Sequence, residues 1–195
     1  MTEKNHHTPS LGADIRFLGN LLGEIITEQH GTEALELVET VRIAAKNRRA
    51  GDEQAARTLI ETITAQDLDH KRILIKAFSN YFQLINIAED QQRIRVLRQR
   101  ERENQQKESI DDAVRRLKEH GFTAVRVADL LAKLSIRLVL TAHPTEAKRK
   151  HVLVKLHQIA DLLALNDRTD LLFHEKYRID NTIRAKIEEL WQTRP

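Results

Sequence analysis

The sequence IRLVLTAHPTE occupies residues 136–146, and its pattern changes part-way along. Residues 136–140 form a short run of bulky and branched apolar side chains, which is typical of a buried β-strand. Pro144 has a fixed φ and no N–H group, so it suits the turn that opens a helix. His143 is therefore expected where a strand ends and a helix begins. Such junctions line clefts and offer unpaired N–H groups to anions, so the stretch indicates chemistry at a phosphate or a carboxylate.

His143 taken alone leaves two interpretations open. Its imidazole titrates near neutral pH, so it can accept, donate or share a proton with an anionic intermediate. It can equally serve only the packing of a turn. The neighbouring residues fit either interpretation, because Thr145 can cap the following helix and Glu146 favours the helix dipole.

The rest of the chain has the periodicity of α-helices. Apolar residues recur at helical spacing nearly everywhere, and the 195 residues include only six glycines and three prolines. In the first half of the chain we predict a helix from Leu11 to a stop at Gly31, a second over residues 33–49 that ends near Gly51, a third capped by Asp52, and a long fourth that is opened by Asp67 and reaches Ala88. In the second half we predict a helix from Ser109 to a stop at Gly121, one over residues 123–133, one that resumes after Pro144, and a last one over residues 169–191.

Residues 91–107 carry five arginines among glutamines and glutamates, with few apolar side chains. Such a segment cannot bury a face, so it is expected to be an exposed helical extension or a mobile crossover. Its charge could suit a nucleic acid, but it lacks interleaved aromatic residues and carries compensating glutamates. We therefore expect no nucleic-acid partner.

The composition indicates a soluble, cytoplasmic protein. A chain of 195 residues with 41% hydrophobic content can bury one core, and 32 basic against 29 acidic side chains leave a net charge of only +3. The absence of cysteine excludes disulfides and fits a reducing compartment. The polar start of the chain lacks a secretory signal, and no window approaches the ~20 apolar residues of a membrane span.

A single predicted strand leaves its own backbone hydrogen-bonding groups without partners. Each N–H and C=O group of residues 136–140 needs a neighbouring strand, and no second convincing strand occurs in the sequence. The chain is therefore expected to be incomplete or to need a partner.

Residues 139–150, VLTAHPTEAKRK, resemble the histidine signature of the phosphoenolpyruvate carboxylase family. Residues 77–89, AFSNYFQLINIAE, resemble the helix that precedes this signature, and weaker similarity extends from residues 14–19 to residues 190–193. Enzymes of this family are several times longer. The resemblance implies a mainly α fold: a helical amino-terminal region over residues 1–134, and the first strand and helix of an incomplete α/β (TIM-type) barrel over residues 135–195.

The resemblance also implies a reaction. Family members condense phosphoenolpyruvate with bicarbonate to give oxaloacetate and phosphate, which replenishes the tricarboxylic acid cycle by carbon dioxide fixation. His143 takes the role of the signature histidine, which stabilises carboxyphosphate and assists its breakdown; a role as proton acceptor from bicarbonate is compatible. Mg²⁺ or Mn²⁺ is expected to be bound by residues outside this chain, which contributes no metal ligand. The enzymes are allosteric homotetramers, and a chain of this length alone is expected to be inactive.

Arg149 and Lys150 are candidates for binding an anion or an effector. Cations in the first turns of a helix oppose its positive end by a few tenths to about 1 kcal/mol each, and a bound anion relieves that conflict. For Lys148 and Lys150 a solvated face is an equally good interpretation. Arg149 matches the arginine of the family motif, whereas Lys150 keeps the charge of the second motif position without the bidentate geometry of arginine.

The remaining polar residues offer weaker signals. His151 and His157 are six residues apart, so they do not share a helical face as a metal pair would. Trp191 and Tyr177 are expected to be packing residues. Two other classes of protein stay open: a helical assembly module without a site of its own, and a nucleic-acid-binding helical protein.

Overall fold

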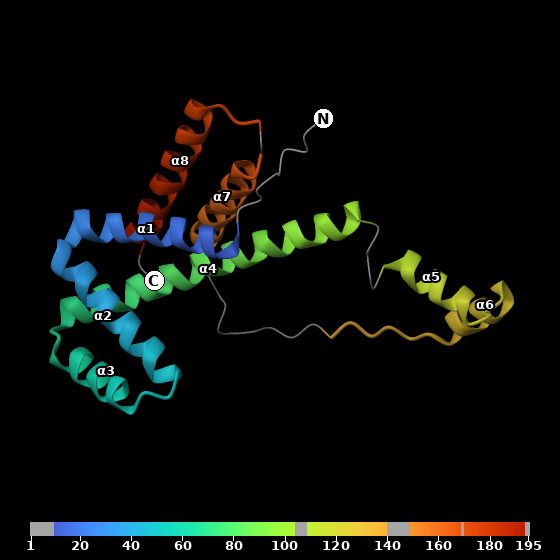
Figure 1. The fold of residues 1–195 in the computed structure, drawn as a ribbon, viewed down its shortest axis with the longest axis horizontal. Coiled ribbons are helices and arrows are strands. Elements are labelled where there is room, and N and C mark those ends of the chain that lie inside the picture. Colours follow the sequence, from blue (N-terminus) through green and yellow to red (C-terminus); the bar gives the residue numbers. More distant parts are fainter. Residues whose placement is uncertain (1–9, 104–108, 140–148, 169, 194–195) are drawn as a thin grey trace. The chain divides into compact units, whose positions relative to one another are not determined.

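A computed structural model describes residues 10–103, 109–139, 149–168 and 170–193 of the chain (Figure 1). Within these ranges all of the regular secondary structure is α-helical, and no β-strand is assigned. The helices are α1 (Leu11–His30), α2 (Thr32–Arg49), α3 (Glu53–Ala65), α4 (Leu68–Arg102), α5 (Ile110–Glu119), α6 (Ala124–Lys133), α7 (Lys150–Asn166) and α8 (Phe173–Gln192). The mainly α fold class is confirmed. None of the helices described combines the length and apolar character that a membrane crossing requires.

Three helix ends lie where local sequence signals predict them. Asp52 accepts a hydrogen bond from the Ala55 N–H at 3.0 Å, and Asp67 accepts one from the His70 N–H at 2.8 Å, so each carboxylate caps the helix that follows it. Directly after α1, Gly31 adopts a φ of 87°, a backbone conformation that residues with a Cβ atom disfavour. These ends confirm the predicted order of helices.

The chain divides into two compact units, and the first comprises Met1–Gln92 together with Arg149–Pro195. In this unit α1 packs against α2 and α8, α2 packs against α3, and α7 packs against α8, so that the first and the last helix are in contact (Figure 1). The largest fully buried side chain is Trp191, with 0% exposure. It belongs to one apolar cluster with Leu18 of α1 and Leu84 of α4. Trp191 is therefore a packing residue, as predicted.

The second unit comprises Arg93–Lys148 and has a different character. Its described part contains the end of α4 and the short helices α5 and α6. No apolar side chain in this described part is buried. The unit therefore lacks an apolar core of its own among the residues described.

The predicted buried strand is not formed in the part of it that the structure describes. Residues 136–139 have no regular secondary structure, and Ile136, Leu138 and Val139 are 77%, 84% and 81% exposed; Leu140 lies outside the described residues. The physical reason is that a strand forms only against a neighbouring strand, and the described residues supply none.

Three further expectations are corrected or decided. The last helix begins at Phe173 rather than near residue 169. At this start, Glu175 accepts a hydrogen bond from the Leu172 N–H at 2.9 Å and so defines the first turn.

Tyr177 is 63% exposed, so its prediction as a packing residue is wrong. Helix α4 continues to Arg102, which favours the exposed extension over the crossover, although Gln91 is buried and donates to Asp167 at 2.6 Å.

Candidate functional site

The candidate site lies around the segment that precedes α7 in the sequence. His143, with Thr145 and Lys148, falls among residues 140–148, which lie outside the described residues. The structure describes the site from Arg149 onward, where Arg149 occupies the N-cap position of α7 with φ −62° and ψ 140°. Helix α7 thus begins at Lys150 with Arg149 at its N-cap, whereas the capping role predicted for Thr145 falls outside the described residues.

Arg149 and Lys150 are both exposed and lie side by side in sequence at the start of α7. Neither forms an ion pair within the part of the chain that the structure describes, and the first turn of α7 contains no acidic residue. The Arg149 carbonyl accepts the first hydrogen bonds of the helix, from Val152 at 2.9 Å and from Leu153 at 3.2 Å. Two cations and the positive end of the helix dipole therefore coincide, an arrangement that favours an anion.

The body of α7 is firmly attached to α8. Ile159 and Leu163 are buried in the same apolar cluster as Ile183 and Ile187 of α8. At the surface, Asn166 donates a hydrogen bond to Asp180 at 2.8 Å. The start of α7 is therefore presented by a helix that is packed along its length.

An ion-pair cluster adds to this attachment. Glu189 of α8 pairs with Lys155 of α7 and, at 2.7 Å, with Lys186 of its own helix. Hydrogen bonds from Lys155 and Lys186 lower the pKa of Glu189 below its ordinary value. The charged form of this carboxylate is thus the one that the fold favours.

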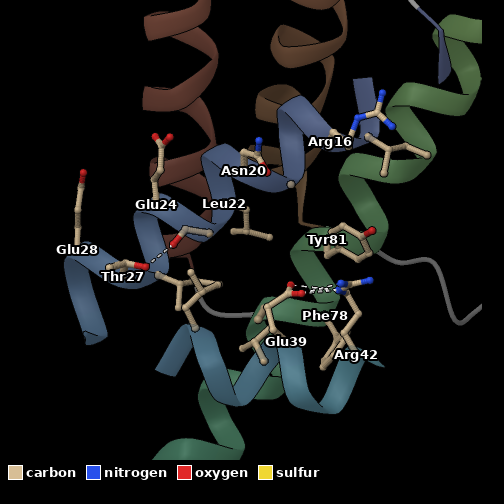
Figure 2. A pocket seen from close by; sticks show the side chains of 17 residues that line it. Arg16, Asn20, Leu22, Glu24, Thr27, Glu28, Glu39, Arg42, Phe78 and Tyr81 are labelled. Atoms are coloured by element: carbon tan, nitrogen blue, oxygen red, sulfur yellow. Dashed lines mark hydrogen bonds and ion pairs between the residues drawn. The ribbon is translucent and has the colours of Figure 1, made fainter. Parts of the chain in front are cut away.

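The second segment that resembles the family lies in α4. Ala77, Leu84 and Ala88 are buried, so packing in the apolar cluster accounts for their residue types. Phe78 and Tyr81 instead line a groove between α1, α2 and α4 (Figure 2). This stretch of α4 is therefore a core helix of the first unit, with one side turned to a groove.

Sequence reasoning did not find this groove, which has a volume of about 760 Å³. Its side wall carries an ion pair, in which Arg42 donates from Nε at 3.1 Å and from Nη2 at 2.6 Å to Glu39, as the dashed lines in Figure 2 mark. The hydrogen bonds to Glu39 raise the pKa of Arg42. Gly19 lines the groove, but an added Cβ there would lie at an ordinary contact distance of 3.5 Å from the Tyr81 ring, so this glycine is no sequence signal for the groove. The groove is a space between three helices whose charged pair is internally satisfied.

The described residues do not fit a metal site. Among residues 10–103, 109–139, 149–168 and 170–193, no three His, Asp or Glu side chains gather closely enough to hold a metal ion. His151 and His157 are exposed on α7. His30, His70 and His120 lie at or near helix ends.

Comparison with known proteins decides the family. A family model described as phosphoenolpyruvate carboxylase matches residues 11–195. The chain belongs to the phosphoenolpyruvate carboxylase family. The match covers α1 through α8, including the signature residues 139–150.

Relatives in the phosphoenolpyruvate carboxylase family are similar along nearly the whole chain. The phosphoenolpyruvate carboxylase of Roseiflexus castenholzii is 42% identical over 97% of this chain, and that of Pseudomonas aeruginosa is 37% identical over 94%. The enzyme of Paraburkholderia xenovorans is 38% identical over 98% of the chain. The chain spans 21% of the Roseiflexus and Pseudomonas relatives and 19% of the Paraburkholderia relative, about a fifth of the length of each.

Proposed function

We propose that the complete protein that contains this chain is a phosphoenolpyruvate carboxylase. It joins phosphoenolpyruvate and bicarbonate to give oxaloacetate and phosphate, and so replenishes the tricarboxylic acid cycle. The observation that carries the proposal is the contiguous signature VLTAHPTEAKRK at residues 139–150, inside a family match that extends over residues 11–195.

His143 is the catalytic residue that this chain contributes. Transfer of the phosphoryl group to bicarbonate forms carboxyphosphate and leaves an enolate; carboxyphosphate then releases phosphate and carbon dioxide, and the enolate carbon attacks the carbon dioxide. An imidazole near the carboxyphosphate can donate a hydrogen bond to its developing charge, or accept the proton that bicarbonate loses. Both roles need His143 beside the anion, and its place between the predicted strand and α7 supports that.

Arg149 and Lys150 bind an anion beside the active site, either a substrate group or an allosteric effector. Their exposure at the positive end of α7 supports this, because no described side chain neutralises them. Arg149 supplies a planar fork that can hold two oxygens of a phosphate or carboxylate, and Lys150 supplies a point charge.

The complete fold is a helical region over residues 1–134 followed by a TIM-type barrel that begins at residue 135. Residues 136–140 become its first strand once the rest of the protein provides neighbouring strands. The exposure of this apolar run, and the coverage of only 21% of the Roseiflexus relative, support the proposal.

The rest of the assignment follows from the family. Mg²⁺ or Mn²⁺ supplies Lewis-acid stabilisation of the anionic groups when bound, and its ligands lie outside this chain. The cysteine-free composition supports a cytoplasmic location. We further propose a homotetramer with allosteric control.

A chimera tests the function directly. Residues 1–195 replace the corresponding part of the Roseiflexus castenholzii relative, and bicarbonate-dependent formation of oxaloacetate from phosphoenolpyruvate is measured with Mg²⁺. We expect activity from the chimera and none from the 195-residue chain alone. Bicarbonate-dependent phosphate release by the isolated chain would overturn the view that it lacks essential groups, and a folded but inactive chimera would overturn the assignment.

A further inference from the structure

Helix α6 has no buried residue along its entire length. Its large apolar side chains are well exposed, with Val125 at 72%, Leu130 at 50% and Leu131 at 60%. Leu134, directly after the helix, is 58% exposed. Soluble proteins rarely leave contiguous apolar surface of this kind uncovered, so α6 indicates an interaction site.

The distribution of polar and apolar residues around α6 shows how much of its surface needs to be covered. Its polar residues, Arg126, Asp129 and Lys133, are spaced three and four positions apart and so form one narrow stripe. Every other position of α6 is apolar. Val125 and Leu130 therefore flank the stripe from its two sides, and the apolar surface wraps around most of the helix.

Helix α5 is a useful contrast in the same unit. Its apolar residues Ile110, Val114 and Leu117 are spaced four and three positions apart and share a single face, and the remaining positions are mostly charged. One packed neighbour is enough to cover such a helix. An apolar surface that wraps a helix is instead typical of a helix buried inside a large protein.

Two observations identify the occupant. The chain spans 21% of its Roseiflexus relative, so most of a full-length protein lies outside the described structure. Helix α6 also runs directly into residues 134–139, the exposed apolar segment for which neighbouring strands are proposed. A part of the protein that covers residues 134–139 would also contact α6, because no linker separates α6 from this segment.

We propose that α6 is a docking surface for the remaining part of the full-length protein, which covers Val125, Leu130 and Leu131 and leaves the stripe of Arg126, Asp129 and Lys133 in contact with solvent. The proposal rests on the proposed full-length carboxylase. In that protein α6 is covered on its apolar surface and reaches solvent only along its polar stripe.

The absence of cysteine from the chain allows a direct test by thiol labelling. Leu131→Cys places one thiol on the apolar surface, and Lys133→Cys places a matched thiol on the polar stripe of the same helix. Both variants are made in the isolated 195-residue chain and in the full-length chimera. Mass spectrometry of the α6 peptide then follows its labelling by a maleimide, so that other cysteines of the chimera do not interfere.

In the isolated chain we expect both thiols to react at similar rates. In the chimera we expect the thiol of Leu131→Cys to react at least about tenfold more slowly than that of Lys133→Cys, since labelling then requires local opening. Equally fast labelling of the two thiols in the chimera would overturn the proposal, because the occupant of α6 would then be a different protein. Protection of Leu131→Cys in the isolated chain that increases with chain concentration would also overturn it, because the occupant would be a second copy.

Labelling is independent of catalysis. A chimera that protects Leu131→Cys but makes no oxaloacetate would contradict the proposed function and support the docking surface. A chimera that makes oxaloacetate while Leu131→Cys stays reactive would support the function and overturn the docking surface.

Discussion

The ammonium group of Lys76 lies 4.8 Å from the centre of the Trp191 ring. This contact joins α4, which carries the first family-like segment, to the end of α8. Burial lowers the pKa of Lys76, and the indole that its ammonium group faces is fully buried. His30 approaches the same ring edge-on, with centroids 5.6 Å apart, so three helices meet at Trp191.

Replacement of Trp191 should therefore be costly. We expect Trp191→Ala to lower the free energy of unfolding of the 195-residue chain by about 3–5 kcal/mol, because it leaves a large cavity among α1, α4 and α8. Urea unfolding followed by circular dichroism measures the change. Tyr177→Ala, on the exposed side of the same helix, is the matched control and should change stability by less than about 0.5 kcal/mol. Equal effects of the two substitutions would contradict the packing described.

The pairing of Glu189 with Lys155 and Lys186 predicts a dependence of stability on pH. Because the pKa of Glu189 is lowered in the folded chain, its contribution is fully present above the ordinary carboxyl value of 4.5 and is lost as pH falls through the lowered value. The greater stability of the wild type over Glu189→Gln should therefore persist from neutral pH down to about pH 4.5 and decrease as the pH falls further.

Thermal unfolding at a series of pH values measures this advantage. Glu61→Gln is the control, since Glu61 is exposed on α3 and forms no ion pair among the described residues. A difference between wild type and Glu189→Gln that stays constant over the whole series would show that the ion pairs do not stabilise the α7 and α8 packing.

Arg149 is expected to act on anion binding rather than on chemistry. In the chimera, Arg149→Gln should weaken the binding of phosphoenolpyruvate or of a sugar-phosphate effector by roughly tenfold, the scale of one charge-assisted hydrogen-bonded pair. The turnover number should change little. Steady-state kinetics with each anion varied in turn measures both quantities, and Arg57→Gln on α3 is the control. An unchanged half-saturating concentration for both anions would exclude Arg149 from the site.

Much of the helical organisation could be predicted from the sequence because its signals are local. Asp52 and Gly31 act within one helical turn of their own positions, so capping rules locate the ends of α3 and α1. Burial is not local. The exposure of Tyr177, the hydrogen bond between Gln91 and Asp167, and the irregular path of residues 136–139 all depend on segments distant in sequence.

The candidate site shows the same division. Arg149 and Lys150 were found from the sequence because their residue types conflict with a helix start, a contrast visible within a few positions. The groove between α1, α2 and α4 was missed, because its existence depends on how far apart three helices pack. His143 was identified by its signature, and its role stays a prediction.

The central claim is that His143 performs chemistry for the complete enzyme, and one substitution tests it most directly. In the chimera, His143→Asn keeps a polar side chain of similar size but cannot exchange a proton near neutral pH. Binding of phosphoenolpyruvate is measured by calorimetry, and oxaloacetate formation by a coupled assay under the same conditions. We predict near-normal binding with a loss of carboxylation of about 10²–10⁴-fold, the range of acid–base catalysis. Carboxylation at close to the wild-type rate would contradict the account.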